Sequence, residues 1–515
     1  MIPALLSLII AFSISALAVV QITMNNFFVV GNVIKSQQSF NIAESGLNYY
    51  LWHLNHNNTD YKDGKTTPTT PDPQLGYGPY VHNYTDNSGK VIGTYTLWLK
   101  PAGNGSTVVK VRSIGQANGS NIKRTVEAQI GSPSFANYGV VSDNALWFGS
   151  TETADGPIHS NLGIRLDGAN TSTASSANAT YTPPAGLGGG TNRPGVWCDS
   201  SVTTPVNCNT RTKTDWLYPV SSVDFNQVSS SLCDIKKVAF ASVASTASLA
   251  TQANACSQIP NTTTAAYLPQ RQASYNEVKG YLIQLNTNGT YDLYKVDAEA
   301  DKQTTYTAAL TRTLVQTGIT IPSSGVIFAE DNVWVRSNPT YHGRVTIASG
   351  RLTASGPASY TNIVIADDLA YSTKNGTDAI GLVAQDAVII APYAPPSTGS
   401  FNFEVDAAVL AQAGEVWYPG RYRTDSGRCT KGWGNSNQTF TFYGSVATRQ
   451  TWTWTWQQGG GCDLTDTVLV NGNRISGILN NTTQYDYNLR YAPPPSYPLT
   501  SGYNFLSWRE VLTGP

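Results

Sequence analysis

The first 34 residues of the chain carry no charged side chain, and Ile2–Val20 is interrupted only by one proline and three serines. At about 1.5 Å of rise per residue, roughly 20 such residues span a hydrocarbon core about 30 Å thick. Beyond this stretch Phe40, Ala43 and Leu47 recur at helical spacing. The pattern predicts one continuous helix over residues 1–55, apolar in front and amphipathic behind. It lacks the basic start and the short apolar core of a secretory signal peptide.

The motif Phe40-Asn-Ile-Ala-Glu-Ser-Gly-Leu47 follows the apolar segment. Together they resemble the N-terminal helix of type IV pilin-like proteins, in particular minor pilins of the PilX type, which carry a similar motif beyond the membrane segment. The resemblance implies removal of a leader before Met1 and packing of the helix into the core of a pilus. The filament-core residues would then include Met1, Leu5, Leu8, Ile9, Phe12, Ala16, Val19 and Glu44.

Two features depart from the pilin pattern. Leu5 stands where most major pilins have a glutamate, and Pro3 is unusual, although a proline in the first helical turn costs little. The missing glutamate favours a minor or initiating subunit. A plain signal-anchor that tethers a surface protein is the alternative, but such an anchor does not require an amphipathic continuation.

The composition of the 515 residues is that of an extracellular, mainly β protein. Only 13% of residues are charged and the net charge is −1, which gives no electrostatic reason to bind nucleic acid or anionic lipid. The chain has 28 tyrosines and 12 tryptophans against two methionines, and many Gly and Asn residues. Strands favour aromatic and β-branched residues, and turns use Gly and Asn.

The six cysteines fall into three sequence-local pairs without a CxxC motif, which argues against zinc, iron–sulfur clusters and covalent haem. Fifteen connectivities are open to six cysteines, and six buried free thiols are the alternative to disulfides. The local pairing requires the shortest loops, and an even count in an exported chain favours disulfides and an oxidising compartment. We therefore expect the pairs Cys198–Cys208, Cys233–Cys256 and Cys429–Cys462.

A degenerate repeat characterises the second half of the chain. In each copy an apolar residue and a small residue precede a polar pair, after which a new strand begins; the copies are Phe328–Trp334, Ile365–Leu369, Val383–Val388 and Leu410–Val416. Coils of about 20 residues with matched corners are typical of a parallel β-helix. A β-sandwich is the alternative architecture.

These patterns predict an α+β fold that is mainly β: a long N-terminal pilin-like helix, a small antiparallel sheet and a parallel β-helix-like (solenoid) head. We expect a linker and a small β-meander over residues 56–134 and the head over 135–515. Within the head, an inserted disulfide-bearing subdomain is expected at about 184–322 and a C-terminal cap at about 490–515, because an open coil would expose its edge.

Candidate chemistry is sparse, and no common catalytic motif is found. Asp331, Asp367, Asp368 and Asp386 recur at corners, where paired carboxylates could act on a glycan or bind a structural Ca²⁺. More often such residues bond turn amides, so we expect no catalytic residue and no cofactor. As one strand, Trp452, Trp454 and Trp456 would share a face, either in the core or as an exposed aromatic ladder.

The sequence therefore predicts a non-enzymatic subunit of a type IV pilus-like extracellular filament that displays a β-rich head for adhesion. Its partners would be other pilin subunits through the helix, the cytoplasmic membrane before assembly, and a glycan or cell-surface ligand, with no nucleic acid. Two alternatives remain: a membrane-tethered β-helical adhesin that does not polymerise, and a carbohydrate-active β-helix enzyme.

Overall fold

The structure is a computed structural model in which the chain forms two compact units. The N-terminal unit comprises Met1–Ala102, Thr107–Ser132 and Gly502–Pro515, and the second unit, here called the head, contains Pro133–Ser501. The described residues are 2–57, 60–65, 70–101, 108–241, 255–257, 259–272, 277–300, 305–353, 356–394, 401–418, 438–450, 452–457, 468–470, 473–478, 480–500 and 502–511.

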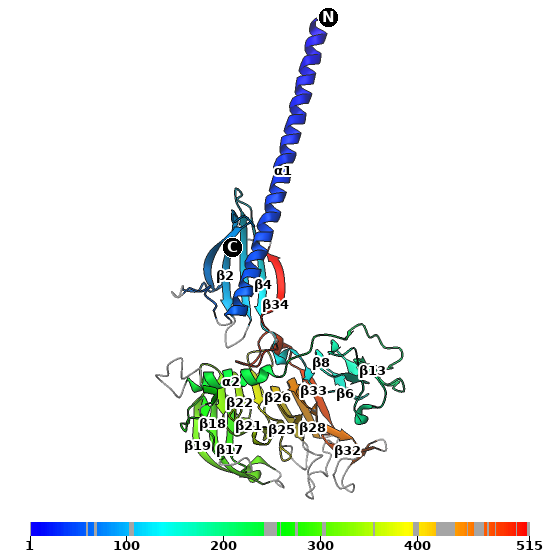
Figure 1. Ribbon diagram of the computed structural model, residues 1–515, viewed down its shortest axis with the longest axis vertical. Helices are drawn as coiled ribbons and strands as arrows, with labels where there is room; N and C mark the ends of the chain where they lie inside the picture. The colour runs from blue at the N-terminus through cyan, green and yellow to red at the C-terminus, as the bar shows by residue number, and fades with distance from the viewer. Residues whose placement is uncertain are drawn as a thin grey trace. The chain divides into compact units, whose positions relative to one another are not determined.

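The N-terminal unit packs the second half of one long helix, α1 (Ile2–His56), against an antiparallel sheet (Figure 1). The sheet has the order β1-β2-β3-β4-β34, with β1 (Tyr77–Thr85), β2 (Val91–Pro101), β3 (Val109–Ala117), β4 (Lys123–Gly131) and β34 (Asn504–Val511). In β3 buried residues alternate with half-buried ones, as expected for a strand with one face on a helix. The core of the unit includes Ile42, Leu47, Tyr50, Leu54, Leu97, Val111, Val126 and Ile130.

The helix lies so close to β3 that there is no room for side chains between the two backbones. A Cβ added to Gly115 would overlap the carbonyl oxygen of Ser39 and the backbone nitrogen of Ala43, and one added to Gly46 would overlap the Ser113 hydroxyl. The Ser39 hydroxyl donates to the Ile122 carbonyl (2.8 Å) and accepts from the Ala117 N–H (3.0 Å). Ala43 and Gly46 of the Ala-Glu-Ser-Gly-Leu motif, together with Ser39 before it, thus supply the small residues on the helix side of this contact.

The C-terminal strand β34 completes the same sheet by pairing antiparallel with β4. The carboxylate of Glu127 on β4 is almost completely buried and receives Arg112 Nε at 2.8 Å and Arg509 Nη2 at 2.6 Å, with Lys110 Nζ at 3.2 Å. Because β4 precedes the head in sequence and β34 follows it, the head is an insertion between two neighbouring strands of the N-terminal unit.

The head is built on two long sheets. The larger has the spatial order β15 (Trp216–Leu217), β11 (Ala174–Ser176), β8 (Ile158–Ser160), β5 (Val140–Ser142), β28 (Gln438–Thr448), β26 (Phe401–Ala411), β24 (Ala379–Ala384), β22 (Arg344–Ser349), β20 (Val326–Ala329), β16 (Tyr267–Leu268); β33 (Asn481–Tyr485) also pairs with β28. The other has the order β19 (Leu310–Thr320), β18 (Thr290–Glu299), β17 (Gly280–Asn286), β21 (Asn332–Asn338), β23 (Ile363–Ile365), β25 (Val388–Ile390), β27 (Val416–Trp417), β29 (Trp452–Thr453).

Smaller sheets accompany these. A parallel sheet has the order β14 (Val196–Trp197), β9 (Ile164–Leu166), β6 (Leu146–Phe148). The remaining pairings are β7 (Thr153–Ala154) with β10 (Ala169–Asn170), β12 (Thr180–Tyr181) with β13 (Arg193–Pro194), and β30 (Thr455–Gln457) with β32 (Asn473–Gly477) and β31 (Val468–Val470).

Neighbouring strands of the larger sheet are parallel along its whole length, but their spatial order is not the chain order. The chain enters at β5, runs through β8 and β11 to β15, crosses back to β16, and then runs through β20 to β28, which pairs with β5. From β20 to β29 successive strands alternate between the two sheets. This alternation is compatible with the predicted solenoid.

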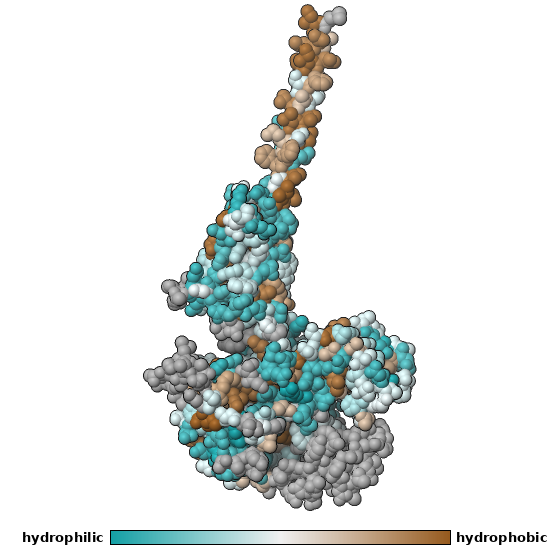
Figure 2. Space-filling view, in the orientation of Figure 1, coloured by the Kyte–Doolittle hydropathy of each residue, from teal (hydrophilic) through white to brown (hydrophobic). Residues whose placement is uncertain are grey.

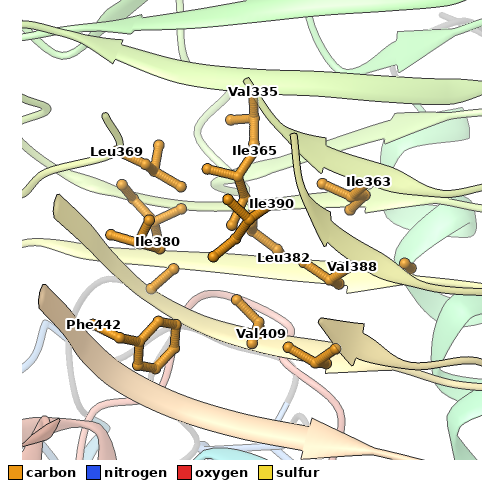
Figure 3. Close-up of a cluster of buried hydrophobic side chains, with 14 of the residues drawn as sticks. Val335, Ile363, Ile365, Leu369, Ile380, Leu382, Val388, Ile390, Val409 and Phe442 are labelled. Atoms are coloured by element: carbon orange, nitrogen blue, oxygen red, sulfur yellow. The ribbon is translucent and has the colours of Figure 1, made fainter. Parts of the chain in front are cut away.

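Like residues stack on neighbouring strands to form the core of the head. Val333, Ile363 and Val388 are in register across β21, β23 and β25, and Ile347, Leu382 and Val409 are in register on the larger sheet. Figure 3 shows how hydrophobic side chains of the core gather between the strands: Val335, Ile363, Ile365, Leu369, Ile380, Leu382, Val388, Ile390, Val409 and Phe442.

Helix α2 (Gln227–Phe240) follows β15 in the chain and covers the other face of the larger sheet. Its buried residues Val228, Leu232, Ile235 and Ala239 belong to one cluster with Phe328 and Leu410, among others. The larger sheet is therefore buried on both faces, as is usual for parallel sheets.

Two predicted segments of the head differ from the structure. The 184–322 segment is not a separate insertion, because β14, β15 and β16 extend parallel sheets and β17 pairs in parallel with β21. The cap expected at about 490–515 is also different. Residues 492 and 493 accept hydrogen bonds from Arg344 of β22, while 504–511 form β34 of the other unit. Strand pairing over such separations leaves no local trace in the sequence.

The tight contact in the N-terminal unit predicts the effect of Gly115→Ala. The added methyl group meets backbone atoms of α1, which cannot move aside alone, so we expect a loss of about 1–3 kcal/mol of stability. Thermal unfolding in detergent, together with limited proteolysis after α1, measures it. Gly186→Ala in the head is the control, because its Cβ would meet nothing within 4 Å. Equal unfolding temperatures for both variants would contradict the contact.

Candidate functional site

The first half of α1 is the most unusual surface of the protein. Every residue from 2 to 34 is exposed, including Phe12 at 78% and Leu8 at 68%. On the face shown in Figure 2, most of this half is hydrophobic. Among the described residues, α1 is the one helix long and apolar enough to cross a membrane, with a mean hydropathy of 2.4 over its best window. The predicted filament-core residues Leu5, Leu8, Ile9, Phe12, Ala16 and Val19 all lie here, while Met1 is outside the described residues.

The hydroxyl side chains of this half are satisfied within the helix itself. Four hydroxyls donate to carbonyls three or four residues earlier at 2.8–2.9 Å: Ser7 to Ala4, Ser13 to Ile9, Ser15 to Ala11 and Thr23 to Val19. A hydroxyl without a hydrogen bond costs free energy in hydrocarbon, where no water can bond it. Hydrogen bonds to the helix's own carbonyls satisfy these hydroxyls without water.

Charge begins where the helix meets its sheet. Lys35 donates to the Asn118 carbonyl at 3.0 Å, and Glu44, also predicted as a filament-core residue, is half-buried within the Ala-Glu-Ser-Gly-Leu motif. Its neighbours Ala43 and Gly46 face the sheet. Glu44 therefore marks the packed half of α1 and lies apart from the fully exposed apolar half.

Two of the three predicted disulfides are present in the head. Cys198 is bonded to Cys208, and Cys233 of α2 is bonded to Cys256. The predicted pair Cys429–Cys462 lies outside the described residues. The local pairings at the first two sites fit an exported protein folded in an oxidising compartment.

Three of the four corner aspartates have separate partners. Asp331 accepts from the backbone N–H groups of Arg271 and Gln272 and from Arg351 Nη2 at 2.8 Å. Asp367 pairs with Arg336 at 3.1 Å, and Asp368 accepts from the Glu404 N–H. Burial raises the pKa of Asp386. In the described part of the chain, no three His, Cys, Asp or Glu side chains are grouped so that they could hold a metal ion.

The Trp452–Trp456 segment does not form one exposed ladder. The strand is interrupted at Trp454, which is buried in the core against Phe440 and Phe442. Trp452 is half-buried and contacts both Phe148 and Trp454. The side chain of Trp456 lies outside the described residues. Of the two arrangements open to these tryptophans, Trp454 therefore takes the core position and is not a surface aromatic, because the bend turns its ring into the core.

The structure adds a charged cluster that the sequence did not indicate. The Asp406 carboxyl is fully buried; Oδ2 accepts from the Tyr371 N–H at 2.9 Å and Oδ1 lies 3.0 Å from Lys374 Nζ, which also contacts Glu404. Burial, and then the charge of Glu404, raises the pKa of Asp406 to about 7. Burial likewise raises the pKa of Asp368 to about 6.

Comparison with known proteins gives little support for an assignment. No family model matches the chain, and no curated protein matches it. A solved structure, the competence-associated pilin ComZ from Thermus thermophilus, is 14% identical with a TM-score of 0.31, over 93% of this chain and 98% of that one. A likeness at this TM-score does not assign a family.

The raised pKa values predict a head that is less stable at higher pH. In an unfolded chain the pKa of an aspartate is about 3.9. Between this pH and the folded-state pKa values of about 6 for Asp368 and about 7 for Asp406, the folded head keeps protons on these two carboxyls that the unfolded chain has released. This contribution to stability is fully present below about pH 4 and is lost as the pH rises through about 6 to 7.

Asp406→Asn stays neutral at every pH and should unfold at a higher temperature than the wild type at pH 8, with the difference shrinking toward pH 5. Calorimetric melting at several pH values measures this. Asp234→Asn is the control, because that carboxylate is 69% exposed and should leave the wild-type pH profile unchanged. A pH-independent offset for Asp406→Asn would contradict the titration.

Proposed function

We propose that this chain is a structural and adhesive subunit of a type IV pilus-like extracellular filament. The observation that carries the proposal is the division of α1 into two halves. One half is uncharged and exposed on every side, and the other is packed into a folded unit through Ser39, Gly46 and Leu54.

The apolar half needs a partner outside the chain. Removing one large aliphatic or aromatic side chain from water is worth about 1.5–3 kcal/mol, and residues 2–34 carry many that the chain leaves exposed. Lipid covers such a surface while the subunit is held in the cytoplasmic membrane. In a filament the helices of neighbouring subunits replace the lipid, and close packing then supplies the interaction.

The continuity of α1 favours assembly over simple tethering. An anchor has only to hold a protein at the membrane and can end in a linker. Here the same helix continues into the folded unit, where a backbone-to-backbone contact with β3 fixes its direction relative to the sheet. A fixed direction is what a subunit needs if its helix is to be stacked in register with identical neighbours.

The head is proposed to face the exterior, where it would contact a glycan, a cell surface or neighbouring subunits. A carbohydrate-active enzyme is the competing function. Pairing of Asp331 and Asp367 with arginines supports a structural role for these acids over catalysis. The half-buried Trp452 could contribute only part of a ring to any sugar contact.

The decisive variant is Ala16→Arg in the full-length chain. It places a charge in the middle of the apolar half, at a cost of about 2.5–3.5 kcal/mol on membrane-insertion scales and with no partner inside a helical bundle. We expect the variant protein to be absent from sheared surface filaments. Quantitative immunoblotting of the sheared and cell-bound fractions measures this.

Asn87→Arg is the matched control, because it adds the same charge to an exposed turn between β1 and β2 and should assemble normally. If wild-type protein stayed wholly in the membrane fraction while filaments formed without it, the tethered adhesin would replace the filament subunit. Wild-type amounts of Ala16→Arg in filaments would show that α1 is not the assembly element.

A further inference from the structure

A lysine and a glutamate meet in the interior of the head, beneath α2. Lys236 of α2 and Glu330, the residue after β20, are both fully buried, and Lys236 Nζ contacts Glu330 Oε1. The same oxygen accepts a hydrogen bond from the Tyr267 hydroxyl at 2.9 Å. The ring of Phe328 lies 5.9 Å from Nζ, so the surroundings are aromatic and apolar.

This pair is poorly satisfied as an ion pair. Among the described residues, Glu330 Oε2 has no hydrogen-bond partner, and Lys236 Nζ has none besides its ion-pair contact with Glu330 Oε1, although both atoms are shielded from solvent. Taking two charges out of water costs several kcal/mol each, and the attraction between them offsets that cost only when the remaining donors and acceptors are also bonded. Burial raises the pKa of Glu330, which favours its neutral acid form.

We propose that Lys236 and Glu330 are joined by an isopeptide bond that forms after the head has folded. A proton passes from the ammonium group to the carboxylate, which leaves a neutral amine and a neutral carboxylic acid. Nζ attacks Cδ of Glu330, the C–N bond forms, and the carboxyl oxygen leaves with two protons as water. The products are one amide and one water molecule, and no oxidant, reductant or activated co-reactant is consumed.

The residues around the pair suit this condensation. The Tyr267 hydroxyl is placed to donate to the oxygen that becomes negative in the tetrahedral intermediate and to bond the amide carbonyl afterwards. Exclusion of water disfavours the reverse hydrolysis. The adjacent carboxyl, Asp331, is held by Arg351 and by two backbone N–H groups, which leaves Glu330 as the carboxyl in contact with the lysine.

The amide would also remove the energetic problem of the pair. It replaces two buried charges with one neutral group whose carbonyl already has a donor in Tyr267. It would join α2 covalently to the end of β20, and so tie the helix that crosses the larger sheet to one of the strands beneath it. A head exposed outside the cell would gain a crosslink that reducing agents cannot open.

The test is the mass of the full-length wild-type protein after reduction in denaturant. We expect it to be lighter than its sequence by one water, and tryptic mapping should find one branched peptide that contains both Lys236 and Glu330. Lys236→Met should have its full sequence mass. Lys237→Met is the matched control, because this neighbouring lysine of α2 is 39% exposed and its loss should leave the branched peptide intact.

A wild-type protein of full sequence mass, with separate peptides for the two residues, would show an ion pair only and overturn the proposal. So would a loss of water that maps to any other pair. Neither measurement depends on whether the variants fold, because the wild type alone decides both.

Discussion

The close contact between α1 and β3 is the constraint on which the N-terminal unit depends. Gly115 and Gly46 have no side chain, and Ala43 and Ser39 have small ones, so two backbones touch where side chains would normally separate them. Overlap at such a site cannot be relieved by choosing another rotamer, because the atoms in the way belong to the main chain. The contact therefore holds the packed half of α1 in one direction and leaves its apolar half to extend beyond the sheet of its own unit.

The head depends in a similar way on the side-by-side pairing of parallel strands in its larger sheet. Its larger sheet is buried by the core on one face and by α2 on the other, so residues on both faces of a strand are apolar. The chain enters this sheet at β5 and leaves after β28, which is the neighbour of β5. Ser134 and Leu499, near the two ends of the head, pair directly, and the Thr500 N–H bonds the Pro133 carbonyl at 2.8 Å. A large domain can thus be inserted between β4 and β34 without separating those strands.

Both units contain buried carboxylates that have cationic side chains or backbone N–H groups as partners. Glu127 has two arginines and a lysine, Asp331 has an arginine and two backbone donors, and Asp406 has a lysine and one backbone donor. Each of these partners comes from another strand or loop, so the pairs specify which segments lie together. The desolvation cost of each carboxylate is offset only in the correct arrangement, which makes such groups better at selecting a fold than at stabilising it.

Features with a local period could be predicted from the sequence, and features that depend on distant pairing could not. The uncharged run before Lys35 and the spacing of Ala43 and Leu47 determine a helix with two different halves, since 3.6-residue periodicity is a property of neighbouring residues. The short spacing of Cys198 and Cys208 likewise favours the disulfide that the structure shows.

Only the tertiary structure decided that β34 belongs to the N-terminal sheet, that β28 meets β5, and that Lys236 faces Glu330. An alternating strand pattern says which face of a strand is buried but not which strand lies beside it. A partner hundreds of residues away is selected by the whole packed arrangement, through register, shape and the pairing of buried charge.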